Sequence, residues 1–195
     1  MLDVRRTRRR AIAPPDRPRW PSRSSETWQA PPALEAAAHE IDPSDARIAT
    51  LAGDVGDPRT GRAIVDLAER RFGGLELLAN NAGVFRPKSF VDVTEEEYDW
   101  FLDTILKGKF FTAQAARALQ RRGGGAIVHT GSLWAIQAVG ATPSAAYSAA
   151  NAGVHALVRN LALELAPHRT AAASMPSRPR WSKLRSTGRS SVTKR

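Results

Sequence analysis

The stretch LELLANNAG, residues 75–83, is an apolar run that passes into a polar turn closed by glycine. Short apolar runs bounded by turn residues are typical of buried strands. Two other stretches have the same form: ARIATLAGDV at 46–55 and GGAIVHTGS at 124–132. The sequence therefore predicts three short strands, each of which ends in polar residues.

Helical patterns separate these strands. TGRAIVDLAERRFG at 60–73 has apolar residues at helical spacing and stops at a glycine pair. TEEEYDWFLDTILKGKFFTAQAARALQRR at 94–122 opens with threonine and has glutamate three residues on, which is a capping box. A third helix is predicted at 145–165, and ALEAAAHEI at 33–41 has the pattern of a helix end. This alternation predicts an α/β fold of parallel βαβ units with helices on both faces of the sheet.

The net charge of +10 belongs to the two ends of the chain. Residues 1–32 carry eight arginines against three acids, and residues 168–195 carry eight Lys/Arg and no acid. The middle, 33–167, has 13 Lys/Arg against 16 Asp/Glu, a balance of −3. Both ends are rich in Arg, Pro and Ser without strand or helix periodicity, so we expect disordered basic tails at 1–32 and 170–195. The middle of the chain has the composition of an ordinary globular domain.

Several classes of function are disfavoured by composition. The chain has no cysteine, and its four histidines are scattered without ligand spacing, so we expect no metal site. No apolar run approaches the ~20 residues of a membrane span, and no hydrophobic region follows the first arginines, so we expect a cytoplasmic protein. A basic arm for nucleic acid and, for the first segment, a transit peptide are the alternatives to simple tails. We favour tails without specific nucleic-acid binding.

Polar residues follow each predicted strand, where ligands bind in open parallel sheets. They are Asp54, the turn at 80–83 and the residues at 130–132. The next helix carries Tyr147 near its start, and Asn151 stands four residues later on the same helical face. Turn chemistry alone explains one such cluster but not three in succession followed by a tyrosine.

These motifs resemble the short-chain dehydrogenase/reductase family of one-domain NAD(P)-dependent oxidoreductases. The resemblance rests on GDV at 53–55, NNAG at 80–83, the serine of VHTGS, and YSAANAGVHALVRNLALELAP from residue 147, and it covers about 33–169. It implies a partial Rossmann-like domain at 33–169, with a doubly wound parallel sheet that is incomplete. It also implies alcohol/carbonyl interconversion of a small-molecule substrate with NAD or NADP, and a homo-oligomer. The alternative is a catalytically inactive remnant, or a basic-tailed binding protein that is not an enzyme.

The resemblance also implies a set of cofactor-binding residues. Asp54 and Val55 correspond to the residues that approach the adenine ring in the family. Asn81, Ala82 and Gly83 correspond to those that flank the adenosine ribose and the central sheet. The residue that would decide between NAD and NADP falls in a strand that the sequence lacks, so that choice stays open.

The catalytic residues implied by the family are Ser132, Tyr147 and the position of Asn151. Ser132 would polarise the substrate carbonyl and Tyr147 would exchange the hydroxyl proton. The family has lysine where this chain has Asn151, and a neutral amide stabilises a tyrosinate less than an ammonium does. The family's relay asparagine is replaced by Ile105, which cannot hydrogen-bond. We therefore expect impaired activity, unless Asn151 is merely a polar residue on an exposed turn.

Both ends depart from the family pattern. No glycine-rich phosphate turn precedes residue 53, and the first, second and last strands are missing or garbled. From Ala172 onward, a shifted frame allows codons for RVNAVAPAVVETPVY, which resembles the family's next strand and its end. The opposite shift across 13–25 allows a helix end and a second strand. We interpret both ends as frameshifted, and we expect very weak NAD(P) binding by the chain as it stands.

Overall fold

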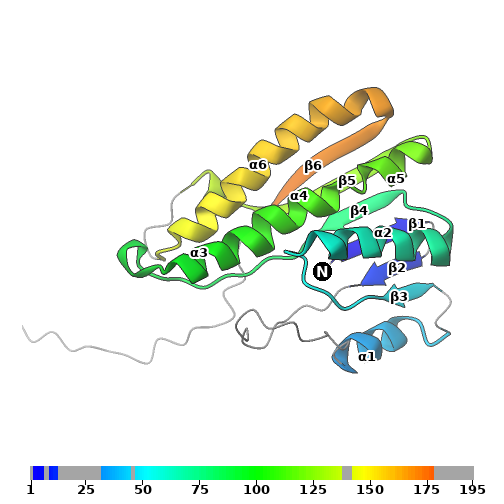
Figure 1. Ribbon diagram of the computed structural model, residues 1–195, viewed down its shortest axis with the longest axis horizontal. Helices are drawn as coiled ribbons and strands as arrows, with labels where there is room; N and C mark the ends of the chain where they lie inside the picture. The colour runs from blue at the N-terminus through cyan, green and yellow to red at the C-terminus, as the bar shows by residue number, and fades with distance from the viewer. Residues whose placement is uncertain (1, 7–8, 13–31, 45–46, 138–141, 178–195) are drawn as a thin grey trace, which may run out of the picture.

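The structure is a computed structural model that describes residues 2–6, 9–12, 32–44, 47–137 and 142–177 (Figure 1). The strands are β1 (Leu2–Arg6), β2 (Arg9–Ile12), β3 (Ile48–Thr50), β4 (Leu77–Asn80), β5 (Gly125–Ser132) and β6 (Thr170–Ser177). The α-helices are α1 (Pro32–Ile41), α2 (Pro58–Phe72), α3 (Glu95–Phe101), α4 (Gly108–Ala113), α5 (Ala116–Arg121) and α6 (Ala145–Leu165). A π-helical segment η2 (Leu102–Lys107) joins α3 to α4, and short 3₁₀ turns are η1 (Phe90–Asp92), η3 (Leu133–Ala135) and η4 (Ala166–His168).

The described strands form one sheet in the order β3-β2-β1-β4-β5-β6. Strands β4, β5 and β6 pair in parallel, as do β2 and β3. Strand β1 is antiparallel to both of its neighbours. The three strands expected within 46–132 are present as β3, β4 and β5, and the predicted parallel α/β architecture is confirmed.

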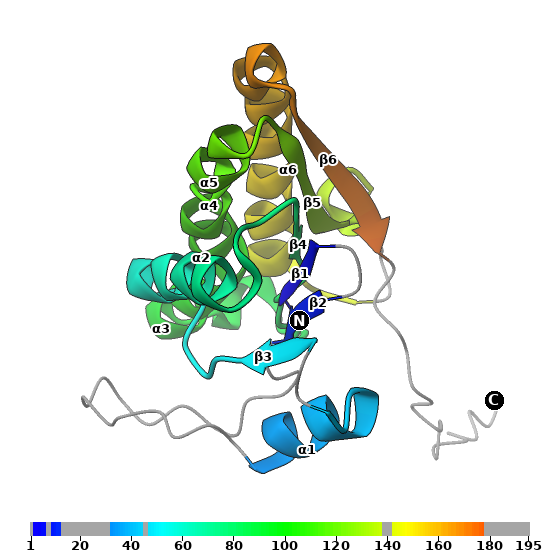
Figure 2. The same cartoon turned by 90° about the vertical axis from the view of Figure 1, so that its right-hand side faces the viewer.

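Residues 2–6 and 9–12 form strands, although composition predicts that they belong to a disordered tail at 1–32. Strands β1 and β2 occupy the space between β3 and β4, which the sequence had left without a common neighbour (Figure 2). The expectation rested on side-chain composition, whereas ladder hydrogen bonds are made by the main chain. The facing edges of β3 and β4 need such partners, and an extended segment supplies them whatever its side chains. Residues 13–31 lie outside the described part.

The tail expected at 170–195 begins with a strand instead. Residues Thr170–Ser177 pair in parallel with the whole of β5, from Gly125 to Ser132. Their run of small side chains has little apolar surface, and for that reason composition did not indicate a strand. Backbone pairing along eight residues compensates for this. Residues 178–195 lie outside the described part.

Helices cover both faces of the sheet, as predicted. Leu78 of β4 packs with α2 and α5, and the register places it in the same row as Ala49 of β3. The neighbouring Ile48 therefore points to the opposite face, because side chains alternate along a strand. There it packs against Leu34 and Ala38 of α1. Helices α2, α4, α5 and α6 lie together on the first face, and α1 lies at the β3 end of the sheet (Figure 2).

Helix boundaries follow local signals. Helix α2 ends at Gly73, which has the left-handed φ of 74° and donates its N–H to Glu69. Helix α3 begins with the predicted capping box, in which the Glu97 N–H donates to Thr94 and the Thr94 N–H donates to Glu97. The single helix predicted at 94–122 is instead divided by η2 and by a break before α5. Over the described residues, no helix is both long enough and apolar enough to cross a membrane.

Candidate active site

The polar ends of β4 and β5 meet at one edge of the sheet, because the two strands are parallel neighbours. The Thr130 hydroxyl donates a hydrogen bond to the side-chain carbonyl of Asn81 across 2.7 Å. This bond ties the turn after β4 to the last residues of β5. Two of the three groups of polar residues predicted at the strand ends are therefore in direct contact.

The third group of polar residues follows β3. Asp54 accepts a hydrogen bond from the backbone N–H of Gly56 at 2.7 Å, which shapes a tight turn. Val55 in this turn lies against Gly108 at the start of α4, where an added Cβ would come within 3.0 Å of the Val55 carbonyl. Glycine at 108 thus allows the turn to rest directly on the helix.

A buried lysine lies beneath the turn that follows β4. Lys109 is 3% exposed, and its ammonium donates to the backbone carbonyl of Ala82. Burial lowers the pKa of Lys109 from 10.5 to about 8. No motif in the sequence marks this residue, although it stands one helical turn after the apolar Ile105 and therefore on the same face.

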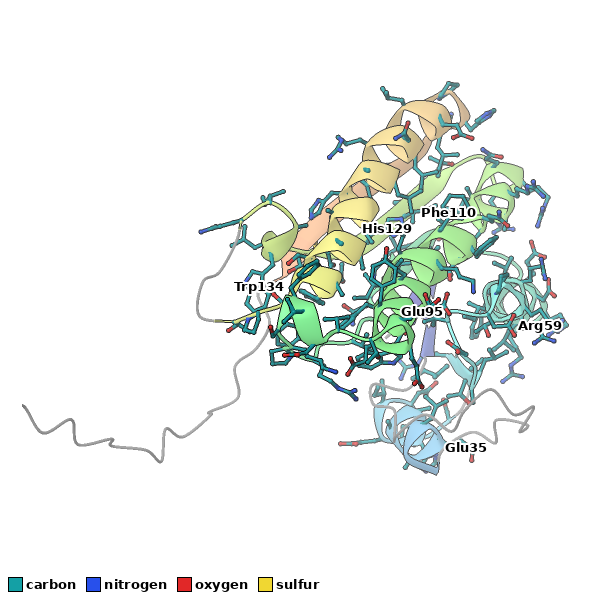
Figure 3. The ribbon with its side chains drawn as sticks, turned by 60° about the vertical axis from the view of Figure 1, so that its left-hand side comes forward. Glu35, Arg59, Glu95, Phe110, His129 and Trp134 are labelled. Atoms are coloured by element: carbon teal, nitrogen blue, oxygen red, sulfur yellow. The ribbon has the colours of Figure 1, made fainter. Side chains whose placement is uncertain are left out.

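His129 and Asn80 complete this buried group. The side-chain amide of Asn80 donates to the Lys109 carbonyl at 3.3 Å and lies 3.4 Å from Nδ1 of His129. His129 is fully buried on the face of the sheet that α2, α4, α5 and α6 cover (Figure 3). Its burial, and secondarily the charge of Lys109, lower its pKa to about 4. The imidazole is therefore neutral near pH 7.

Ser132 ends β5 and is completely buried. Its hydroxyl accepts a hydrogen bond from the Trp134 N–H at 3.2 Å, which starts the turn η3. Its backbone carbonyl lies 3.3 Å from Nε2 of His155 on α6. The imidazole approaches this closely because residue 131 is glycine, where a Cβ would come within 2.9 Å of the same nitrogen.

Tyr147 lies in the first turns of α6 and is 8% exposed. Three aromatic rings surround it edge-on, with centroids 5.0 Å away for Phe85, 5.9 Å for Trp134 and 6.3 Å for Phe101. Edge-to-face contacts of this kind hold a ring in a definite orientation. Through Trp134, the tyrosine packs on the same short turn that the Ser132 hydroxyl caps.

Asn151 is buried, with 3% exposure, so the alternative of a polar residue on an exposed turn is wrong. Its amide nitrogen donates to the backbone carbonyl of Tyr147 at 2.9 Å, one helical turn back. The amide is thus engaged with its own helix rather than with the phenol. Ile105 is 1% exposed and belongs to the apolar cluster around Tyr147.

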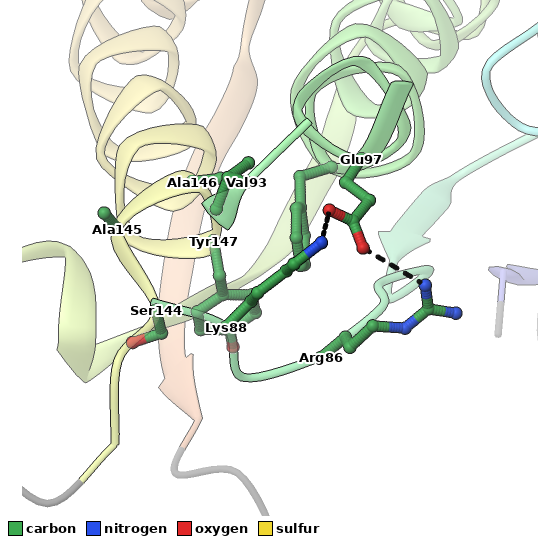
Figure 4. Close-up of a pocket in the computed structure, with 9 residues that line it drawn as sticks. Arg86, Lys88, Val93, Glu97, Ser144, Ala145, Ala146 and Tyr147 are labelled. Carbon is green, nitrogen blue, oxygen red and sulfur yellow. Dashed lines mark hydrogen bonds and ion pairs between the residues drawn. The ribbon is translucent and has the colours of Figure 1, made fainter. Parts of the chain in front are cut away.

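An open depression lies beside Tyr147 (Figure 4). Its wall combines apolar and charged side chains, namely Arg86, Lys88, Val93, Glu97, Phe101 and Ser144–Tyr147. Ser132 does not line it. The geometry defines a Rossmann-like α/β protein whose polar strand ends and buried tyrosine gather at the carboxyl edge of the sheet.

Comparison with known proteins agrees with this description. Residues 27–174 match the family model described as enoyl-(acyl carrier protein) reductase. The match covers most of the chain and includes α1 and the first residues of β6. The chain belongs to the short-chain dehydrogenase/reductase family.

The curated relatives are dehydrogenases and reductases. L-rhamnose-1-dehydrogenase of Scheffersomyces stipitis is 33% identical over 128 residues, which are 65% of this chain and 49% of that protein. Sepiapterin reductase of Chlorobaculum tepidum is 34% identical over 134 residues, 67% of this chain and 53% of that protein. The chain therefore spans about half the length of the curated relatives it matches.

Solved structures show the same fold. A short-chain type dehydrogenase/reductase from Mycobacterium marinum superposes with a TM-score of 0.69 at 32% identity, covering 74% of this chain and 59% of that one. A short chain dehydrogenase from Burkholderia cenocepacia, solved in complex with NADP, gives a TM-score of 0.67 at 31% identity, covering 73% and 57%.

Proposed function

We propose that this chain is an NAD- or NADP-dependent oxidoreductase that interconverts a small-molecule alcohol and its carbonyl compound. The observation that supports this most strongly is the order of parts along one sheet edge. The NNAG turn follows β4, Ser132 ends β5, and Tyr147 begins the helix that comes next. Because the chain belongs to the short-chain dehydrogenase/reductase family, these residues correspond to the family's catalytic and cofactor-binding residues.

In this proposal Tyr147 gives or takes the hydroxyl proton and Ser132 polarises the carbonyl oxygen. The edge-on rings of Phe85 and Trp134 support the orientation of the phenol. Ser132 accepts a hydrogen bond from the Trp134 N–H, and its own O–H proton can still be donated to a carbonyl oxygen.

Asn151 stands in the position that would stabilise the tyrosinate. Its amide supplies a dipole rather than a charge, and the dipole is used on the Tyr147 carbonyl. Each unit by which the pKa of a phenol is lowered corresponds to ~1.4 kcal/mol of preferential stabilisation of the anion. We therefore expect slow proton exchange at neutral pH.

The proposed cofactor contacts are Asp54 and Val55 for the adenine ring, and Asn81, Ala82 and Gly83 for the adenosine ribose. Gly83 supports this assignment, because an added Cβ there would meet only the Asn81 carbonyl, at 3.9 Å, so the turn is open. The nicotinamide, when bound, would supply the hydride. Within the described residues no glycine-rich turn at a helix start offers backbone N–H groups to a pyrophosphate.

The test uses a gene corrected to the reading frames inferred for its two ends. The corrected protein should reduce carbonyl compounds with NADH or NADPH, and Tyr147→Phe and Ser132→Ala should each reduce the rate by at least about 100-fold. The chain as it stands should bind either nucleotide far more weakly than the corrected one. A corrected protein that binds nucleotide tightly but reduces none of a broad carbonyl panel would support the non-catalytic alternative instead.

We also propose a homo-oligomer. Phe110 of α4 is 47% exposed and Leu163 of α6 is 80% exposed, and both helices lie on the same face of the sheet. Apolar side chains left open on neighbouring helices favour contact with a second copy. Sedimentation velocity of the purified protein tests this.

A further inference from the structure

The depression beside Tyr147 carries an unequal set of charges at its rim. Two cations, Arg86 and Lys88, share one carboxylate, Glu97 (Figure 4). The rest of its wall is largely apolar and includes Val93 and Phe101. A net positive rim above an apolar wall suits an anionic ligand with a hydrocarbon skeleton.

Glu97 is already bound by other groups. One of its carboxylate oxygens accepts from Lys88 at 2.6 Å, from the Thr94 N–H at 3.1 Å and from the Thr94 hydroxyl at 3.3 Å. The Lys88 ammonium first, and the Thr94 N–H second, hold the pKa of Glu97 below its usual value. The charge of this carboxylate is therefore matched by Lys88, and the same group caps α3.

Arg86 is oriented by an aromatic ring, but its guanidinium lacks a hydrogen-bond partner among the described residues. Its nearest carboxylate oxygen, on Glu97, is 3.7 Å away, which is too far for a hydrogen bond. Its guanidinium carbon lies 4.9 Å from the centroid of the Trp100 ring, a cation–π contact that orients the planar group. The side chain is 59% exposed, and its guanidinium makes no hydrogen bond to any residue in the described ranges.

We infer that Arg86 is a specificity determinant that binds the carboxylate of the substrate, so that the substrate class is a hydroxy acid or the corresponding oxo acid. This inference rests on the proposed function. A guanidinium offers two parallel N–H groups that match the two oxygens of a carboxylate. Lys88 stays paired with Glu97, which leaves the Arg86 guanidinium for the ligand. Val93 and Phe101 contact the carbon skeleton between the carboxylate and the carbon that reacts at Tyr147.

The experiment measures binding to the full 195-residue chain, so it does not depend on turnover. The probes are 3-phenylpropionate and its neutral counterpart 3-phenylpropanol, titrated at low ionic strength by calorimetry or by NMR. The acid should bind at least about tenfold more tightly than the alcohol, a difference that corresponds to ~1.4 kcal/mol. Arg86→Gln should abolish this preference, and Arg86→Lys should retain only part of it.

The matched control is Arg159→Gln, which removes an exposed arginine three helical turns from Tyr147 on α6 and should leave the preference unchanged. Equal binding of the two probes, binding of neither, or an undiminished preference in a folded Arg86→Gln protein would each overturn the inference. A preference that depends on Arg86, together with no hydride transfer in the frame-corrected protein, would refute the proposed function and leave the carboxylate site standing.

Discussion

Asn151 and Lys109 are two buried polar residues with opposite consequences for the candidate site. In the proposed mechanism, Asn151 places a neutral amide where a cation would help Tyr147 lose its proton, and its hydrogen bond goes to its own helix. Lys109 places a cation beneath the turn after β4, where its ammonium donates to the Ala82 carbonyl. A positive charge would be useful at position 151, but the buried positive charge is carried by Lys109, where burial disfavours it.

A lysine at position 151 should increase the rate of carbonyl reduction. In the frame-corrected protein, Asn151→Lys should raise the rate about tenfold or more near neutral pH, because a cation one helical turn away stabilises the tyrosinate. Steady-state rates of the two proteins at neutral pH provide the measurement. A gain that persists in the double variant with Tyr147→Phe would show that the lysine acts by another route.

Burial of Lys109 should make stability depend on pH. Its pKa is about 8 in the folded chain against an ordinary 10.5, so the unfolded chain binds the proton more tightly. The free energy of unfolding should therefore rise between pH 8 and 10.5, by up to about 3 kcal/mol, with the full penalty present below pH 8. Lys109→Met should remove this rise in urea unfolding curves. Lys107→Met, an exposed lysine two residues away, is the control and should keep it.

At the level of elements, α4 is placed by direct backbone contact. The turn after β3 rests on Gly108, whereas Gly153 of α6 faces only the end of the Leu106 side chain, at 2.8 Å from an added Cβ. Both glycines lie in helices, where alanine is favoured by ~1 kcal/mol. The two positions differ in what a methyl group would meet.

Alanine at these two glycines should therefore have different effects. Gly108→Ala should lower the free energy of unfolding by roughly 1–3 kcal/mol, because the Val55 carbonyl is main chain and cannot move without shifting the turn. Gly153→Ala should be close to neutral, because Leu106 can change rotamer. Thermal unfolding of both variants compares them. Equal destabilisation would mean that the turn does not rest on α4 as described.

At the level of the whole molecule, the sheet depends on the hairpin made by the first two strands. β1 and β2 connect β3 with the half of the sheet that carries Ser132 and leads to Tyr147. The register joins Val4 to both Ala11 and Leu78, so this residue lies at the centre of the ladder. Without the hairpin, the Asp54 turn would lose its connection through the sheet to the NNAG turn.

Proline at position 4 tests this connection. Val4→Pro removes a ladder N–H in a central strand and should lower the melting temperature by more than about 4 °C relative to Val4→Ala, which corresponds to roughly 1 kcal/mol or more. The alanine variant controls for loss of the side chain. Identical melting temperatures for the two variants would show that residues 2–12 behave as the basic tail that composition predicts.

Local signals in the sequence predicted much of the fold and part of the site. The capping box at Thr94, the glycine stop after α2 and the apolar strands β4 and β5 each depend on neighbouring residues. The contact between Asn81 and Thr130 followed from the rule that parallel strands end at one edge. The buried group of Asn80, Lys109 and His129 could not be predicted, because it depends on which helix face packs against the sheet.

Local sequence patterns indicated the family, the alternation of strands and helices between residues 33 and 165, and the candidate residues Ser132, Tyr147 and Asn151, because periodicity, caps and motif spacing are properties of short segments. They predicted one helix at 94–122, where the structure has α3, α4 and α5. The positions of β1 and β2 between β3 and β4, and the strand at Thr170–Ser177, are seen in the three-dimensional structure alone. The burial of Asn151 is seen there as well. Main-chain pairing and burial join segments far apart in the chain, and no local pattern of side chains records which segments will meet.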